Sequence, residues 1–250
     1  MEAAHLGVAF SRSPDRDLDD ALAVLGGIPK SPHLDELFED GGTVKEAKLA
    51  DLAMARDWLK VALEVRAKAP RVLPPVSLAI PTWLYGAEPT MPFATHYAKY
   101  YQNSLREEAL INNSRAGIIY ARGGGGTMRE VFQDVELNYY AKSPDDVTPM
   151  IFFDRDDYWR KDPELDEGHP LLPSLKLDVV VANAIALGLR SAGFHKEDVE
   201  RCLSTKIKFT IDLMAITNTL EAHAQASQRN LRFALASEPL HIGTLRLNRR

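Results

Sequence analysis

The fold is decided by the stretch "GIIYARGGGGTMREVFQDVELNYYA", residues 117–141. Its first five residues form an apolar run that is typical of a strand buried in a parallel sheet. Residues 127–141 place apolar side chains at helical spacing, and four consecutive glycines join the run to this helix. The stretch therefore predicts a strand, a glycine loop and a helix, which is the repeating unit of an α/β domain.

The flanking sequence predicts further elements of the same kind. "VSLAI" (76–80) and "TPMIFF" (148–153) are short apolar runs that predict two more parallel strands. Apolar spacing predicts helices over residues 1–10, 17–26, 44–70, 94–113 and 127–141. From residue 176 onward the sequence predicts a mainly helical region, including "KFTIDLMAITNTLEAHAQ" (208–225). We therefore expect an α/β domain over residues 1–175 and a helical C-terminal region over residues 176–250.

Composition excludes several classes of function. The formal net charge of -5 argues against a general nucleic-acid binder, because affinity for the phosphate backbone requires a basic surface. Cys202 is the only cysteine, so no intrachain disulfide and no cysteine metal cluster can form. The histidines show no metal-binding pair, and no apolar run approaches the ~18 residues of a membrane span. No secretory signal is apparent at the N-terminus, so a cytoplasmic protein without a metal site is expected.

The glycine loop predicts a phosphate-binding site. At the start of a helix the first N–H groups have no intrahelical acceptor, and glycines allow an anion to approach them closely. A P-loop is excluded because Gly126 is followed by Thr127 and Met128 rather than by Lys and Ser or Thr. A dinucleotide fingerprint is excluded because its third glycine would fall on Arg129 or Met128. Thr127 is expected to cap the helix and to bind the phosphate.

Read as Gly-Gly-x-Gly-Thr-x-x-Glu, residues 123–130 resemble the motif of the LONELY GUY (LOG) family, also labelled lysine-decarboxylase-like. The match covers Gly123, Gly124, Gly126, Thr127 and Glu130. Arg122 stands where the family usually has proline. The family also has an arginine on the preceding helix; Arg106 corresponds to it, although Glu107 follows where the family has lysine.

The resemblance extends to a larger bacterial branch of nucleotide-binding LOG-like proteins and covers roughly residues 1–160. "MEAAHLG" (1–7) resembles the tail of a first phosphate-loop motif, "GGGPGxMEAAxLG", in that branch. The resemblance implies a Rossmann-like parallel sheet flanked by helices that lacks its first βαβ portion. Glu2 corresponds to an acid that follows the first loop, and a contact with ribose or base is expected of it.

The resemblance further implies a hydrolase that cleaves a nucleoside 5′-monophosphate such as AMP into free base and ribose 5-phosphate. Glu130 and Arg106 would be the catalytic residues; no cofactor is implied, and a homodimer is expected. Asp134, one turn beyond Glu130, is expected to be a solvated acid. A non-catalytic carrier of a nucleotide or nucleotide cofactor and an inactive truncated homologue remain alternatives. Phosphate binding is expected of Gly123, Gly124, Gly125, Gly126 and Thr127.

Overall fold

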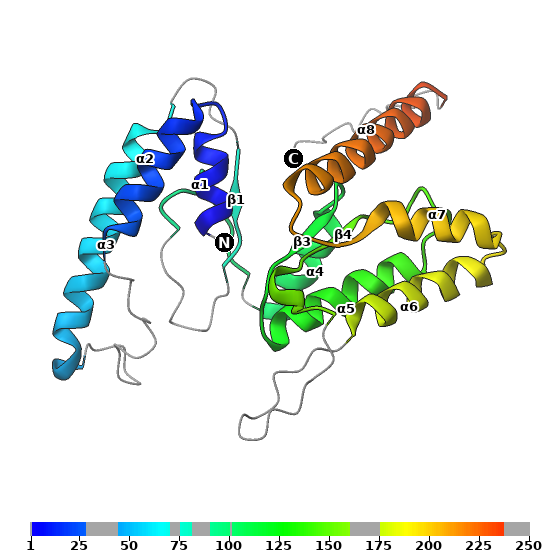
Figure 1. Ribbon diagram of the computed structural model, residues 1–250, viewed down its shortest axis with the longest axis horizontal. Coiled ribbons are helices and arrows are strands. Elements are labelled where there is room, and N and C mark those ends of the chain that lie inside the picture. The colour runs from blue at the N-terminus through cyan, green and yellow to red at the C-terminus, as the bar shows by residue number, and fades with distance from the viewer. Residues whose placement is uncertain are drawn as a thin grey trace, which may run out of the picture. The chain divides into compact units, whose positions relative to one another are not determined.

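The computed structural model describes residues 2–28, 45–70, 76–81, 91–100, 102–160 and 176–237. Internal contacts divide the chain into two compact units, Met1–Glu107 and Glu108–Arg250, and the boundary falls within helix α4 (Asn103–Asn113). The sequence-based boundary at residue 175 lies outside the described residues and stays a prediction. Each unit is considered by itself below (Figure 1).

The first unit contains three helices and a minimal parallel sheet. Its helices are α1 (Glu2–Phe10), α2 (Asp15–Gly26) and α3 (Leu49–Lys68), the last preceded by a short 3-10 turn, η2 (Glu46–Lys48). The helices bury a common core of Leu6, Phe10, Ala21, Ala62 and Val65. α3 ends at Lys68, and the next residue, Ala69, has the extended conformation (φ -63°, ψ 147°) that is favoured before a proline, here Pro70. The three predicted helices of this region are confirmed.

A two-stranded sheet in the same unit corrects one prediction. Strand β1 (Leu78–Ala79) pairs in parallel with β2 (His96–Tyr97), and α4 begins only at Asn103. The prediction of a helix beginning at residue 94 is therefore wrong. The reason lies in the side chains of Ser77 and Thr95: the Ser77 N–H donates to Thr95 Oγ1 (2.8 Å), and the Thr95 N–H donates to Ser77 Oγ (3.2 Å). These bonds offer the backbone an alternative to a helical turn.

The second unit is built on a three-stranded parallel sheet with the order β3-β4-β5. β3 (Ile118–Tyr120) and β4 (Met150–Phe153) confirm two predicted strands, and α5 (Gly125–Tyr139) confirms the helix between them. A segment after β4 forms a short 3-10 turn, η3 (Arg155–Asp157). The remaining elements are α6 (Leu177–Ser191), α7 (Lys196–Lys206), β5 (Ile207–Thr210) and α8 (Leu213–Ser237).

Strand β5 was not predicted, because its sequence "IKFT" lies between helical segments without a turn signal. Its Phe209 is in register with Phe152 of β4, which is in turn in register with Tyr120 of β3. The three rings form a stacked row across the sheet, with ring centroids 5.1 Å apart for Tyr120 and Phe152 and 4.4 Å for Phe152 and Phe209. Pairing with the buried central strand overrides the local helical preference.

One face of this sheet is covered by α5, α6 and α7 (Figure 1). The core that results includes Val131 and Val135 of α5, Val181 and Ile185 of α6, and Val199 of α7. α6 packs closely against the end of α5 at Gly188, where an added Cβ would lie 2.8 Å from the carbonyl carbon of Tyr139. Glycine is required here by close packing against the backbone of Tyr139. Backbone conformation does not require it, because φ at Gly188 is outside the left-handed region.

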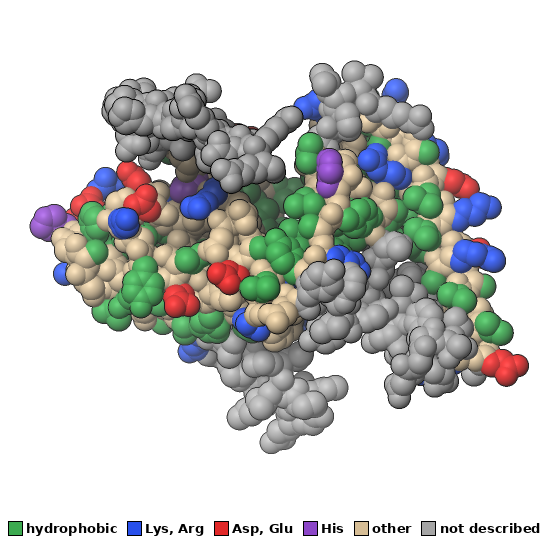
Figure 2. Space-filling view, turned by 180° about the vertical axis from the view of Figure 1, so that it is seen from behind, with side chains coloured by type: hydrophobic (Ala, Val, Ile, Leu, Met, Phe, Trp, Pro, Cys, Tyr) green, Lys and Arg blue, Asp and Glu red, His purple; other side chains and the backbone are tan. Residues whose placement is uncertain are grey.

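The surface carries both charged and apolar side chains. Figure 2 shows one face of the molecule, on which basic, acidic and apolar side chains are interspersed. Exposed apolar side chains include Leu187 and Val179 of α6 and Tyr140 at the end of α5. Within the described ranges, no helix is both long enough and apolar enough to cross a membrane.

Candidate functional site

The glycine loop lies at the carboxyl end of β3 and leads directly into α5. Gly124 is the N-cap residue in an extended conformation, no side chain caps the helix, and the N–H of Met128 donates to the Gly124 carbonyl (3.1 Å). Thr127 is consequently the third helical residue, and the prediction that it caps the helix is wrong: Gly125 and Gly126 adopt the helical conformation and move the start upstream. The N–H groups of this first turn have no intrahelical acceptors.

Packing requires glycine at only one of the four positions in the loop. An added Cβ at Gly123 would lie 2.8 Å from Cβ of Thr127, so packing within the loop restricts this position. At Gly124, Gly125 and Gly126 an added Cβ would meet no atom within 4 Å. Among the described glycines φ is positive only at Gly117 and Gly193, so backbone conformation does not require these three glycines either. Their missing side chains leave the helix terminus open to a close approach.

A cavity of about 280 Å³, called the Glu130 cavity below, lies beside the loop. Arg122, Thr127 and Glu130 line it together with Tyr120 of β3 and Ile111 of α4. Thr127 and Glu130 are three positions apart on α5 and therefore share a helix face. A hydroxyl, a carboxylate and the cation that follows β3 thus border one cavity, which runs along β3 and reaches the loop at the carboxyl end of this strand.

Tyr158 holds the loop from the other side. Its hydroxyl donates to the Gly123 carbonyl (2.9 Å), and the Arg122 guanidinium lies over its ring, 4.7 Å from the centroid. Tyr158 and Trp159 line a second cavity of about 250 Å³ together with the loop glycines. Arg122 is therefore positioned by a cation–π contact at the edge of the loop.

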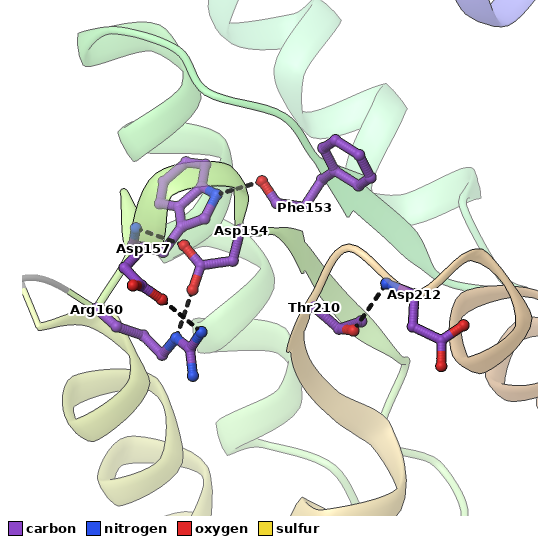
Figure 3. A network of polar contacts seen from close by, with 7 residues as sticks. Phe153, Asp154, Asp157, Arg160, Thr210 and Asp212 are labelled. Atoms are coloured by element: carbon purple, nitrogen blue, oxygen red, sulfur yellow. Dashed lines mark hydrogen bonds and ion pairs between the residues drawn. The ribbon is translucent and has the colours of Figure 1, made fainter.

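A polar network at the ends of β4 and β5 fixes the segment that carries Tyr158 (Figure 3). The buried Asp154 carboxylate accepts hydrogen bonds from the Trp159 N–H (2.9 Å) and from the Arg160 guanidinium. Arg160 also donates to Asp157 (2.8 Å), and the indole N–H of Trp159 donates to the Phe153 carbonyl (3.3 Å). Burial of a carboxylate is stabilised by such charge-assisted bonds, so the network gives Tyr158 a defined position against the loop.

Asp134 is buried, and the prediction of a solvated acid is wrong. Only 1% of its surface is exposed, because its face of α5 packs against β3. The Tyr120 hydroxyl donates to Asp134 Oδ2 (2.8 Å), and the Asn138 amide lies 3.4 Å from Oδ1. Asn138 is itself fixed by the backbone of Thr148, to whose carbonyl it donates (3.2 Å) and from whose N–H it accepts (2.8 Å).

Burial changes the titration of this pair. Desolvation raises the pKa of Asp134 from 3.8 to about 7, although the hydrogen bond from Tyr120 acts in the opposite direction. The pKa of Tyr120 is raised far above its usual value, first by burial, then by the charge and hydrogen bond of Asp134, and finally by the charge of Glu130. Near neutral pH Asp134 therefore holds a proton for part of the time, which a solvated aspartate does not.

The other predicted site residues lie in the first unit. The Arg106 guanidinium donates to Asn103 Oδ1 (2.8 Å) and to the Ile80 carbonyl (3.3 Å), which places it beside the end of β1. Glu2 begins α1, and its side chain lies outside the described residues. Since Arg106 and Glu130 belong to different units, their juxtaposition stays a prediction.

Sequence reasoning missed Tyr120, Tyr158 and Asn138. A usable signal existed for Asn138, because Thr127, Glu130, Asp134 and Asn138 follow one another at helical spacing on α5. In the described part of the chain no group of three or more His, Cys, Asp or Glu side chains could hold a metal ion. Comparison with protein-family models, curated proteins and solved structures found no match for this chain.

Proposed function

We propose that this chain is a nucleoside 5′-monophosphate hydrolase with a Rossmann-like sheet, which cleaves the N-glycosidic bond to give free base and ribose 5-phosphate. The proposal joins the resemblance of residues 123–130 to the LOG motif with the arrangement of the glycine loop and Glu130. The 5′-phosphate is assigned to the loop and the ribose to the Glu130 cavity. Homodimer formation and a cytoplasmic location accompany the proposal as expectations from the sequence.

The observation that carries the proposal is the run Gly124–Gly126. Neither packing nor backbone conformation requires glycine at these three positions. Glycine inside a helix lowers stability by about 0.5–1 kcal/mol relative to alanine, and Gly125 and Gly126 are helical. Glycine at these positions would be explained by an anion that approaches the exposed N–H groups of the first turn closely, whereas the fold itself does not explain it.

The residues of the Glu130 cavity suit the chemistry of glycosidic cleavage. Departure of the base leaves positive charge on the ribose, which a nearby carboxylate stabilises. Glu130 is one turn of α5 beyond the loop, so a phosphate held there would orient the sugar toward this carboxylate. Arg122, at the mouth of the loop, adds a fixed cation for the phosphate.

Glu130→Gln is expected to abolish base release, because the amide keeps the shape of the side chain and removes its charge. The measurement is chromatography of AMP, GMP, CMP and UMP after incubation with the full chain. Glu136→Gln, an exposed acid on the same helix, is the matched control and is expected to leave the rate unchanged. No release by a folded chain that binds AMP would contradict the hydrolase proposal and support the carrier alternative; neither release nor binding would contradict both.

Gly126→Ala is expected to separate binding from stability. The added methyl group meets no protein atom within 4 Å, so the free energy of unfolding should stay the same or rise by about 0.5–1 kcal/mol. Affinity for AMP should fall at least about tenfold, because the methyl group occupies space assigned to the phosphate. Urea unfolding and calorimetric titration measure the two quantities. Unchanged affinity would show that the phosphate does not approach Gly126.

A further inference from the structure

A polar stripe runs along the face of α5 that packs on β3. Thr127 and Glu130 line the Glu130 cavity, whereas Asp134 and Asn138 line another cavity of about 420 Å³, called the Asn138 cavity below. Ile111 and Ser114 line both cavities, so the two adjoin. The stripe therefore leads from the glycine loop toward the opposite end of α5, where the Asn138 cavity is bordered by exposed residues such as Tyr140.

Tyr120 and Asp134 connect the two cavities. Tyr120 lines the Glu130 cavity, Asp134 lines the Asn138 cavity, and a hydrogen bond of 2.8 Å joins the hydroxyl of the first to the carboxyl of the second. Both side chains are almost fully buried, with 3% and 1% exposed. A buried hydroxyl and a buried carboxyl in direct contact can exchange donor and acceptor roles when the carboxyl gains or loses a proton.

We propose that Tyr120 and Asp134 form a proton path between the two cavities and that Tyr120 protonates the departing base. The proposal rests on the proposed hydrolase function. As the C–N bond breaks, its electron pair goes to the base nitrogen, which takes the phenol proton of Tyr120. The phenol oxygen takes the carboxyl proton of Asp134 in the same step, so no tyrosinate forms. Asp134 regains a proton from solvent through the Asn138 cavity.

The proton released by the attacking water leaves through Glu130. Water attacks the anomeric carbon of the ribose, and its proton passes to the Glu130 carboxylate and then to solvent. The sum of both branches is one water consumed, one neutral base released and one ribose 5-phosphate formed. No oxidant, reductant or metal takes part.

The surroundings of Asp134 allow it to carry this proton. Burial raises its pKa to about 7, so it is partly protonated at neutral pH. The titratable or charged groups that face the same space are Tyr120 from β3, Glu130 on its own helix, and Arg115, Tyr140, Lys142 and Asp146, which line the Asn138 cavity. A general acid works best when its pKa lies near the working pH.

The test compares two substrates that differ only in their leaving group. AMP requires protonation of its base, whereas 4-nitrophenyl β-ribofuranoside 5-phosphate releases 4-nitrophenolate, which does not. Tyr120→Phe is expected to lower kcat on AMP about 100-fold and to change kcat on the aryl substrate less than about threefold. The variant keeps the ring that stacks on Phe152. Tyr139→Phe, which removes a hydroxyl from the same helix as Asp134, is the matched control and should change neither rate.

Asp134→Asn provides the second variant. It should show the same selective loss on AMP. It should also remove the decline of kcat above about pH 7 that the proton path predicts for the wild type. Equal losses on both substrates, or no loss on AMP, would overturn the proton path and leave the hydrolase proposal standing. Wild-type protein that hydrolyses neither substrate would overturn the hydrolase proposal and the proton path with it.

Discussion

Raising the pH from about 3 to about 8 should weaken the folded state by about 4 kcal/mol through Asp134 alone. The pKa of this carboxyl is raised from 3.8 to about 7 in the fold, a difference of about three units, and each unit corresponds to about 1.4 kcal/mol. The folded state binds the proton more tightly than the unfolded chain. The stabilisation is therefore complete below about pH 4 and is lost as the pH rises through 7.

Asp134→Asn isolates this effect because the amide does not titrate. In urea unfolding at pH 5, 6, 7 and 8, the stability of the variant relative to wild type should rise by about 2 kcal/mol between pH 5 and pH 7 and then level off. His5 and His223 act in the opposite direction, since burial lowers the pKa of both and their stabilisation is lost as the pH falls. Their contribution is common to both proteins and cancels in the difference. Parallel stability curves would show that Asp134 is ionised throughout.

Gly188→Ala should destabilise the second unit by about 2 kcal/mol. The new methyl group would lie 2.8 Å from the carbonyl carbon of Tyr139 and 2.9 Å from its Cα, which are backbone atoms of α5 and cannot rotate away. Helices α5 and α6 would have to separate, and overpacking of this kind costs about 1–3 kcal/mol. The intrinsic preference of helices for alanine, about 1 kcal/mol, offsets part of the penalty.

Gly126→Ala is the matched control for this substitution. It makes the same chemical change in a helix of the same unit, at a position where the methyl group meets nothing within 4 Å. Gly188→Ala should therefore lower the midpoint of thermal unfolding, whereas Gly126→Ala should leave it unchanged or raise it. If both variants behave alike, helix propensity rather than packing governs Gly188.

The parts of the fold that were predicted correctly have local causes. The strand over residues 117–121 and the helix that follows it are encoded by an apolar run, a glycine loop and helical spacing within one stretch. Strand β5 has a non-local cause, because its "IKFT" becomes a strand only by pairing with β4, more than fifty residues earlier. The late start of α4 likewise depends on Ser77, eighteen residues before Thr95.

The same distinction applies to the candidate site. Gly123–Gly126 and Glu130 were found because the motif is contiguous in the sequence. Asp134 was misjudged because its environment is set by Tyr120 of a neighbouring strand, and helical spacing does not reveal which face of α5 is buried. Tyr158 was missed because its contact with the Gly123 carbonyl spans thirty-five positions.

The central strand of the parallel sheet has a consequence for the order in which the chain folds. β3 has already been synthesised when β4 emerges, so these two strands can pair early. The other partner of β4, strand β5, emerges only after α6 and α7. Until then one edge of β4 lacks its partner, and Phe152 lacks the ring of Phe209. Such long-range pairing slows folding and leaves an unpaired edge exposed to other chains. The nascent protein should therefore depend on chaperones most strongly between the completion of β4 and that of β5.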